Sequence, residues 1–281
     1  MVDLKSITVN RLVAIGPRFL PFADVATDDV PLSRLLRLSL FQVTVGMALV
    51  LLVGTLNRVM IVELAVPASL VAGMLALPLV FAPFRVLIGF RSDANVSALG
   101  LRRLPFIWKG TLYQFGGFAV MPFALLMLSG YGESADAPRW IGLSAAAVAF
   151  LLVGAGLHMV QTVGLALATD LVREDDHPKV VGLMYVMLLG GMVGASLIYG
   201  AVLDPYTPGR LVQVIQGTAV VTALLNICAM WKQEPRDRAR AQQMKAAPKA
   251  DFWRSWGDLI DRAGTMRLLV VIALGTFGFG M

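Results

Sequence analysis

Long apolar runs separated by short polar connections dominate this chain. A helix needs about 20 residues to cross the ~30 Å hydrocarbon core of a membrane, and six runs reach that length. They are Leu38–Met60, Ala68–Ile88, Trp108–Ser129, Trp140–Ala168, Val180–Leu203 and Leu211–Trp231. A seventh run, Leu268–Met281, stops without a polar end, so we expect the sequence to be part of a longer chain. The pattern predicts an all-α polytopic membrane protein.

The lengths of the connections predict how the spans are grouped. The links at 61–67, 130–139 and 204–210 are short, whereas residues 232–267 form a long, charged stretch. Six spans, a long linker and a fresh span are the layout of the major facilitator fold, in which two six-helix bundles follow each other. We therefore divide the chain into an N-terminal segment, a six-helix bundle, a basic linker with an interfacial helix and the start of a seventh helix, at residues 1–37, 38–231, 232–267 and 268–281.

The distribution of basic residues predicts the orientation of the bundle. Of the 24 Lys and Arg residues, all but Arg58, Arg139 and Arg210 fall on one side of the predicted membrane. Among them are Arg85, Arg91 and Lys109, which we place in the connection between the second and third spans. Because loops rich in Lys and Arg stay in the cytoplasm, the N-terminus is predicted to be cytoplasmic. The dispersed charges form no nucleic-acid-binding module, so we expect no nucleic-acid partner.

Composition excludes several classes of function. Hydrophobic residues make up 57% of the chain and charged ones 15%, and the mean hydropathy is +0.74, which leaves too little polar surface for a soluble globule. The single cysteine, Cys228, can form neither a disulfide framework nor a thiolate metal cluster within this chain. No nucleophile elbow, Walker loop, histidine pair or carboxylate cluster occurs at membrane depth. We do not expect an enzyme.

Polar residues inside the predicted spans are the candidate functional residues, because an unsatisfied polar group there is costly. The fourth span places His158 and Gln161 three residues apart on one helical face. The imidazole could bond across the bundle, relay a proton or ligate the magnesium of a chlorin. We favour the first role, and we predict no intrinsic metal site. Asp170, at the end of this span, is a further candidate for a buried polar residue.

The first span carries Asn57 and Arg58 at its far end, followed by Glu63. Two explanations remain open. The long side chain of Arg58 could reach water at the interface, or the three residues could form a buried polar cluster. We favour the first explanation because Asn57 lies about 20 residues from the start of the span.

Three further local patterns predict structure. Pro78 and Pro83 in the second span, and Pro122 in the third, remove backbone donors and should bend their helices. Gly190 and Gly194 in the fifth span form a small-xxx-small pair, which allows close approach of another helix; we favour packing within the bundle. In the linker, three aromatic residues at near-helical spacing predict a short helix on the membrane surface, which could instead dock a partner. They are Phe252, Trp253 and Trp256.

Four segments of the chain resemble the PucC/LhaA family of the major facilitator superfamily, and the resemblance is closest in character to its LhaA-like members. The segments are RLLRLSLFQVTVGMALVLLVGTLNRVMIVEL, FAPFRVLIGFRSDANVSALGLRRLPFIWKGT, GLHMVQTVGLALATDLV and GTFGFGM. The resemblance implies a twelve-span protein of the bacterial inner, intracytoplasmic photosynthetic membrane. It also implies a role in assembling light-harvesting complexes, with LhaA-like members serving the core antenna and PucC-like members the peripheral one. We favour the core antenna here.

The resemblance also implies partners and a pigment. The expected partners are the light-harvesting α and β polypeptides, the reaction centre with its core antenna, pigment-biosynthesis or insertion machinery, and membrane lipids. The expected cofactor is bacteriochlorophyll or a chlorin precursor, held transiently, for which His158 and Gln161 are the candidate residues. The resemblance does not decide whether a carotenoid also binds.

The connection between the second and third spans resembles the cytoplasmic signature loop of the superfamily. The matching residues are Gly89, Asp93, Gly100, Arg102 and Arg103, although the insertion of ANVSAL departs from the pattern. That departure argues against a rocking transport cycle, and a scaffold can outlive its original function. Three hypotheses therefore stand: an antenna assembly factor, which we favour, a secondary transporter of a small or amphipathic solute, and a permanent subunit of a photosynthetic complex.

Overall fold

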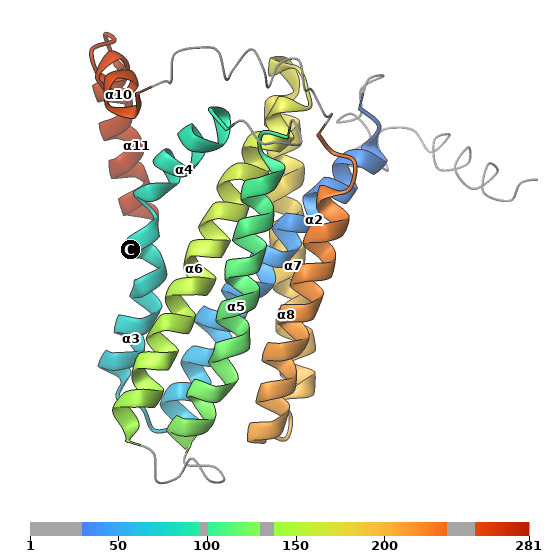
Figure 1. Ribbon diagram of the computed structural model, residues 1–281, viewed down its shortest axis with the longest axis vertical. Coiled ribbons are helices and arrows are strands. Elements are labelled where there is room, and N and C mark those ends of the chain that lie inside the picture. The colour runs from blue at the N-terminus through green and yellow to red at the C-terminus, as the bar shows by residue number, and fades with distance from the viewer. Residues whose placement is uncertain (1–29, 96–100, 130–137, 235–250, 281) are drawn as a thin grey trace, which may run out of the picture.

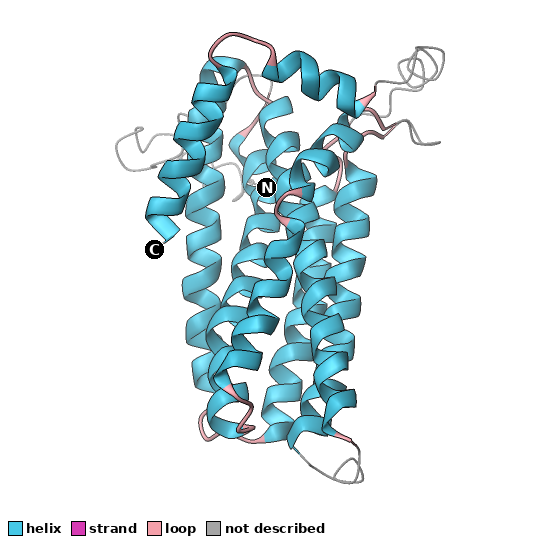
Figure 2. Cartoon of the chain, turned by 90° about the vertical axis from the view of Figure 1, so that its left-hand side faces the viewer, coloured by secondary structure: helices cyan, strands magenta, loops and turns pink. Residues whose placement is uncertain are grey.

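The computed structural model describes residues 30–95, 101–129, 138–234 and 251–280, and the regular elements within these ranges are all helices (Figures 1 and 2). The elements are α2 (Leu32–Leu49), η2 (Val50–Leu56), η3 (Val59–Glu63), α3 (Ala68–Ala76), η4 (Leu77–Phe81), α4 (Phe84–Asp93), α5 (Leu104–Ser129), α6 (Arg139–Asp170), η6 (Glu174–Asp176), α7 (His177–Val202), α8 (Pro208–Met230), α10 (Phe252–Ile260) and α11 (Thr265–Gly280). Six helical stretches are long and apolar enough to cross a membrane. The predicted all-α, multi-pass membrane protein is confirmed.

The helices run past the apolar runs that predicted them. The first spans Leu32–Glu63, and the second ends at Asp93 instead of Ile88. Arg91 therefore lies within α4, and its predicted place in the connection is wrong. Arg85 and Lys109 lie within α4 and α5, as the predicted spans that contain them require, and not in the connection to which we also assigned them. Proline marks several helix starts, since Pro31, Pro67 and Pro138 immediately precede α2, α3 and α6. Their fixed φ suits the entry to a helix.

Proline breaks the second span as predicted. Pro78 lies in the 3₁₀ segment η4, and Pro83 directly precedes α4, so α3, η4 and α4 form an interrupted rod. Pro122, in contrast, lies inside α5, which stays a single helix of 26 residues. The first span changes to π-helix at η2 and η3, which the sequence pattern did not predict.

Glycines let the bundle helices approach closely at their main crossings. The most extensive contact joins α5 and α6, where a Cβ on Gly156 would lie 2.4 Å from the backbone oxygen of Gly110. At the crossing of α2 and α7, a Cβ on Gly46 would lie 2.5 Å from the oxygen of Leu188, and one on Gly191 would lie 2.7 Å from the Cα of Val43. Larger side chains at these positions would force the backbones apart.

The six spans are buried to very different extents within the bundle. In the most apolar stretch of α5, half of the residues are buried. In the corresponding stretch of the α3–η4–α4 rod only 11% are buried, and in that of the span containing α7 28% are. The rod packs mainly on α6. Both the rod and α7 therefore present apolar surface on the outside of the described bundle.

Candidate functional site

A cluster of charged side chains joins four segments at one end of the bundle. We call this end, where α2 and α5 begin and α4, α6 and α8 finish, the basic end; it is uppermost in Figure 1. Arg103, whose side chain is 7% exposed, donates to both carboxylate oxygens of Asp170, at 2.5 and 3.0 Å. It also forms an ion pair with Asp93 at 2.8 Å, and Arg102 pairs with the same Asp170. The forked pairing of Arg103 therefore ties the start of α5 to the ends of α4 and α6.

Glu234, just beyond α8, completes this cluster by capping α5. Its carboxylate accepts hydrogen bonds from the backbone N–H groups of Arg102, Arg103 and Leu104, at 2.8 to 3.2 Å. These donors belong to the N-terminus of α5, where intrahelical acceptors are lacking and negative charge is stabilising. The neighbouring Gln233 accepts from Arg34 through its backbone oxygen at 2.6 Å and donates to the Arg34 backbone oxygen at 3.2 Å. Residues 233–234 thus bind the starts of both α2 and α5.

The predicted signature-loop residues meet only in part. Asp93, Arg102 and Arg103 lie close together. They contact or lie beside Asp170, which the sequence analysis had proposed as a buried polar residue and not as part of the signature loop. Gly89 lies in α4, where a Cβ would be 4.0 Å from Thr162, so its small size is not required there. Gly100 lies outside the described residues. Sequence reasoning missed Arg34, Gln233 and Glu234, because their partners are distant in the chain and no local spacing indicates the contacts.

His158 is buried where α6 meets the interrupted second span. Its side chain is 8% exposed, and its ring interacts with the backbone of Pro78. One turn earlier, a Cβ on Gly154 would lie 2.6 Å from Pro78, so the two segments are in tight contact. One turn later, Thr162 accepts a hydrogen bond from Arg85 Nε at 2.9 Å. Gln161, the other predicted pigment residue, is half-buried on the same helix.

Among the described residues, His158 lies in a contact between helices. The Nδ1 atom is fully buried and has no hydrogen-bond partner among the described residues, and Pro78 packs on α6 one turn earlier, at Gly154. We therefore describe the imidazole as part of a helix contact, and pigment ligation by His158 stays a prediction. The described residues also contain no group of three or more His, Cys, Asp or Glu that could hold a metal ion.

The end of the first span agrees with the explanation that we favoured, in which Arg58 extends to the interface. Arg58 and Glu63 are exposed and Asn57 is half-buried, so these residues do not form the buried polar cluster that was the alternative. Asp170 is exposed too, at the surface of the charged cluster.

Elsewhere in the interior, three buried polar side chains are connected by hydrogen bonds. Thr44 on α2 donates to Asn226 Oδ1 on α8 at 2.9 Å, and Asn226 donates to Thr111 on α5 at 3.0 Å. These bonds satisfy the amide inside an apolar core and join three helices.

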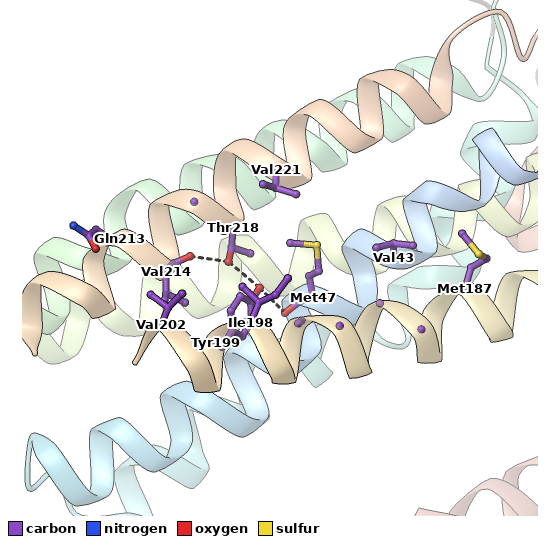
Figure 3. A pocket seen from close by; sticks show the side chains of 15 residues that line it. Val43, Met47, Met187, Ile198, Tyr199, Val202, Gln213, Val214, Thr218 and Val221 are labelled. Atoms are coloured by element: carbon purple, nitrogen blue, oxygen red, sulfur yellow. Dashed lines mark hydrogen bonds between the residues drawn. The ribbon is translucent and has the colours of Figure 1, made fainter. Parts of the chain in front are cut away.

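An apolar groove runs along the outside of the bundle between α7 and α8, with α2 as its floor (Figure 3). Its volume is about 460 Å³, and its α7 side extends from Met187 to Val202, which is about 22 Å of helix. Tyr199 and Thr218 share a hydrogen bond of 2.8 Å across the groove, and Thr218 also donates to Val214. The hydroxyl groups are therefore satisfied within the protein, and the groove presents a mainly apolar surface.

Glycines make this groove accessible to another backbone. Gly190, Gly194 and Gly217 line it, and nothing lies within 4 Å of a Cβ built on any of them. The predicted intramolecular packing of Gly190 and Gly194 is not found among the described residues, where Gly191 makes the contact with α2 instead. Successive residues of a helix are rotated by about 100° around its axis, so Gly191 faces α2 while its neighbour Gly190 faces the groove.

The three aromatic residues of the linker, Phe252, Trp253 and Trp256, lie in α10, and the predicted short helix is present. Phe252 contacts Phe90 of α4 edge-on, with ring centroids 5.4 Å apart, and Trp256 stacks on Phe252. Trp253 is 74% exposed. Asp251 caps the helix by accepting from the Trp253 backbone N–H at 3.2 Å. Phe252 thus holds α10 on α4, while Trp253 remains available to a membrane surface or a partner.

Comparison with known proteins gives consistent matches. A family model described as PUCC protein matches residues 55–281. The chain is 70% identical to Protein PucC of Rhodobacter capsulatus over 99% of its length, and 61% identical to Protein PucC of Rhodovulum sulfidophilum over all of it. It is 60% identical to Protein PucC of Cereibacter sphaeroides over 97% of its length.

These alignments cover 60, 62 and 59% of the three relatives. The chain therefore spans about three fifths of the length of the curated relatives it matches. No solved structure matches it.

Proposed function

Because this chain belongs to the PUCC protein family, we propose that it takes part in assembling bacterial light-harvesting complexes, by holding an antenna polypeptide in the membrane. The proposed location is the photosynthetic inner membrane, with the basic end in the cytoplasm, where loops rich in Lys and Arg are retained. The proposed role is that of a binding partner, not an enzyme.

The observation that carries this proposal is the glycine-lined groove between α7 and α8. Apolar surface gives no hydrophobic driving force between helices in lipid, so helix association there depends on close packing of backbones. The open Gly190 and Gly194 supply that possibility along one face, and Gly217 supplies it on the other. A single transmembrane helix, as an antenna polypeptide provides, matches a long, narrow, apolar surface of this kind.

The relatives also bear on which antenna is served. The sequence resemblance led us to favour the core antenna, with PucC-like members serving the peripheral one. The three relatives at 60 to 70% identity are all named Protein PucC. We therefore now favour the peripheral antenna. Bacteriochlorophyll remains a proposed cargo, carried with the polypeptide.

The test is to fill the groove without disturbing the bundle. Gly190→Leu and Gly194→Leu place side chains into open space, so folding should be retained. Gly182→Leu and Gly200→Leu are matched controls, because these glycines are also open and on α7 but do not line the groove. Tagged full-length protein from phototrophically grown cells would be purified in mild detergent, and the antenna polypeptides and pigment that accompany it would be measured.

We expect the two groove variants to lose the antenna polypeptides and the controls to keep them. Retention by all four variants would contradict the groove as the binding surface. If the wild-type protein carries no antenna polypeptide but supports saturable solute uptake into vesicles, the transporter hypothesis replaces ours. A fixed stoichiometry in the mature complex would instead indicate a permanent subunit.

A further inference from the structure

A second groove lies at the basic end, between the starts of α2 and α5 and the end of α8. Its volume is about 1230 Å³. Its floor is apolar, with Leu104 on α5 and Ile227 on α8, and its flanks carry Trp108 and Trp231, both exposed. Tryptophan favours the depth at which hydrocarbon meets headgroups. The groove therefore combines an apolar part within the membrane with a mouth at its surface.

The mouth of this groove is positively charged. Arg34 lines it and donates only to the neutral oxygens of Gln233 among the bonds described, so these bonds leave its charge uncompensated. Lys232, also in the lining, is exposed and forms no ion pair with a described residue. The acid in the lining, Glu234, has its carboxylate turned to the three backbone N–H groups at the start of α5. The two cations thus remain available to an external anion.

The backbone at Lys232 supplies an independent observation. This residue follows the C-cap of α8 and has a φ of +52°, in the left-handed region where glycine is usual after a helix. A lysine adopts that conformation at a cost. Strained residues cluster where the side chain has a function, and here the conformation holds the ammonium group beside the groove.

From these observations we propose that the groove binds an anionic phospholipid. The phosphate lies between Arg34 and Lys232, the Trp108 and Trp231 rings flank the glycerol region, and an acyl chain follows the apolar floor between α5 and α8. The start of α2 adds to the attraction, because its first turn contains no acidic residue and no side-chain cap is found among the described residues, so the positive end of this long helix is not offset there. The site is separate from the groove between α7 and α8.

The experiment measures which lipid stays bound to the full chain. Protein in mixed micelles with equal amounts of phosphatidylglycerol and phosphatidylcholine would be analysed by native mass spectrometry. We expect phosphatidylglycerol to be preferred by about five-fold for each cation, the factor associated with one basic residue at an anionic surface. Lys232→Gly removes the charge and relieves the backbone, so this variant should fold and lose about five-fold of the preference. Arg34→Gln should lose a similar factor.

Two controls define what would overturn the proposal. Lys232→Arg keeps the charge and should keep the preference. Arg173→Gln removes an exposed cation at the same end of the bundle but outside the groove, and it should change nothing. Equal binding of the two lipids by the wild-type protein, or an equal loss in Lys232→Gly and Arg173→Gln, would refute a lipid site. Displacement of the lipid by excess inorganic phosphate would show a free-anion site and overturn the lipid assignment.

Discussion

Replacing Arg103 by methionine tests how much the charged cluster contributes to the stability of the bundle. The substitution keeps the aliphatic stem but removes the guanidinium, which donates twice to Asp170 and pairs with Asp93. Removing one partner of a fully buried ion pair costs about 3–5 kcal/mol. Here the carboxylates of Asp170 and Asp93 are 33% and 56% exposed, so water replaces part of the interaction. We expect a loss of about 2 kcal/mol in the free energy of unfolding.

Asp93 and Asp170 should contribute unequally to this loss of unfolding free energy, because their side chains are exposed to different extents. Asp93→Asn removes one exposed ion pair and should cost about 0.5 kcal/mol, whereas Asp170→Asn should cost more than Asp93→Asn because Arg102 and Arg103 both depend on it. Unfolding in SDS titrations, followed by far-UV circular dichroism, gives the free energies. A double-mutant cycle then isolates each pair. The reasoning is refuted if Arg103 is coupled to Asp170 no more strongly than to Asp93.

Three further predictions concern packing, the buried polar side chains and an alkaline transition. Gly46→Leu should abolish folded protein, because a Cβ at this position would lie 2.5 Å from the backbone oxygen of Leu188, while Gly190→Leu should not; detergent-resistant yield and size-exclusion profiles distinguish them. Asn226→Leu breaks two hydrogen bonds and should lower the free energy of unfolding, measured in the same SDS titrations, by about 1–2 kcal/mol. An unchanged free energy would mean that the bonds of Asn226 to Thr44 and Thr111 do not stabilise the bundle. Burial, and secondarily Glu63, raise the pKa of Tyr206, which lies outside the spans. Its contribution to stability is thus full below the unfolded pKa near 10 and is lost as pH rises through the folded value, so Tyr206→Phe should lessen the alkaline loss of helicity.

Much of the fold could be predicted because membrane insertion imposes a simple rule on the sequence. Each span must present about 20 apolar residues, so the six runs and the proline breaks at Pro78 and Pro83 were visible directly. The ends were less well predicted, because a helix continues through polar residues at the interface until a proline or a cap stops it. Arg91 shows this: it was assigned to a loop, yet it lies inside α4, which ends at Asp93.

The candidate sites were predicted less completely, for a different reason. Asp93, Arg102 and Arg103 stand near one another in the sequence, and their likeness to a known loop drew attention to them. Glu234 contacts the same cluster from 130 or more positions away along the chain. No periodicity within a helix can indicate such a contact, because it depends on how the ends of different helices come together.

The sequence by itself determined the class of this protein, its six long helices and its family, since these follow from hydrophobic length and from motifs that are local. Only the tertiary structure decided which face of each helix is covered. It placed Gly191 against α2 and left Gly190 open, and it buried His158 beside Pro78. The physical reason is that most residues inside a membrane span are apolar or small, so composition does not distinguish a packed face from an open one. That distinction arises only when neighbouring helices meet.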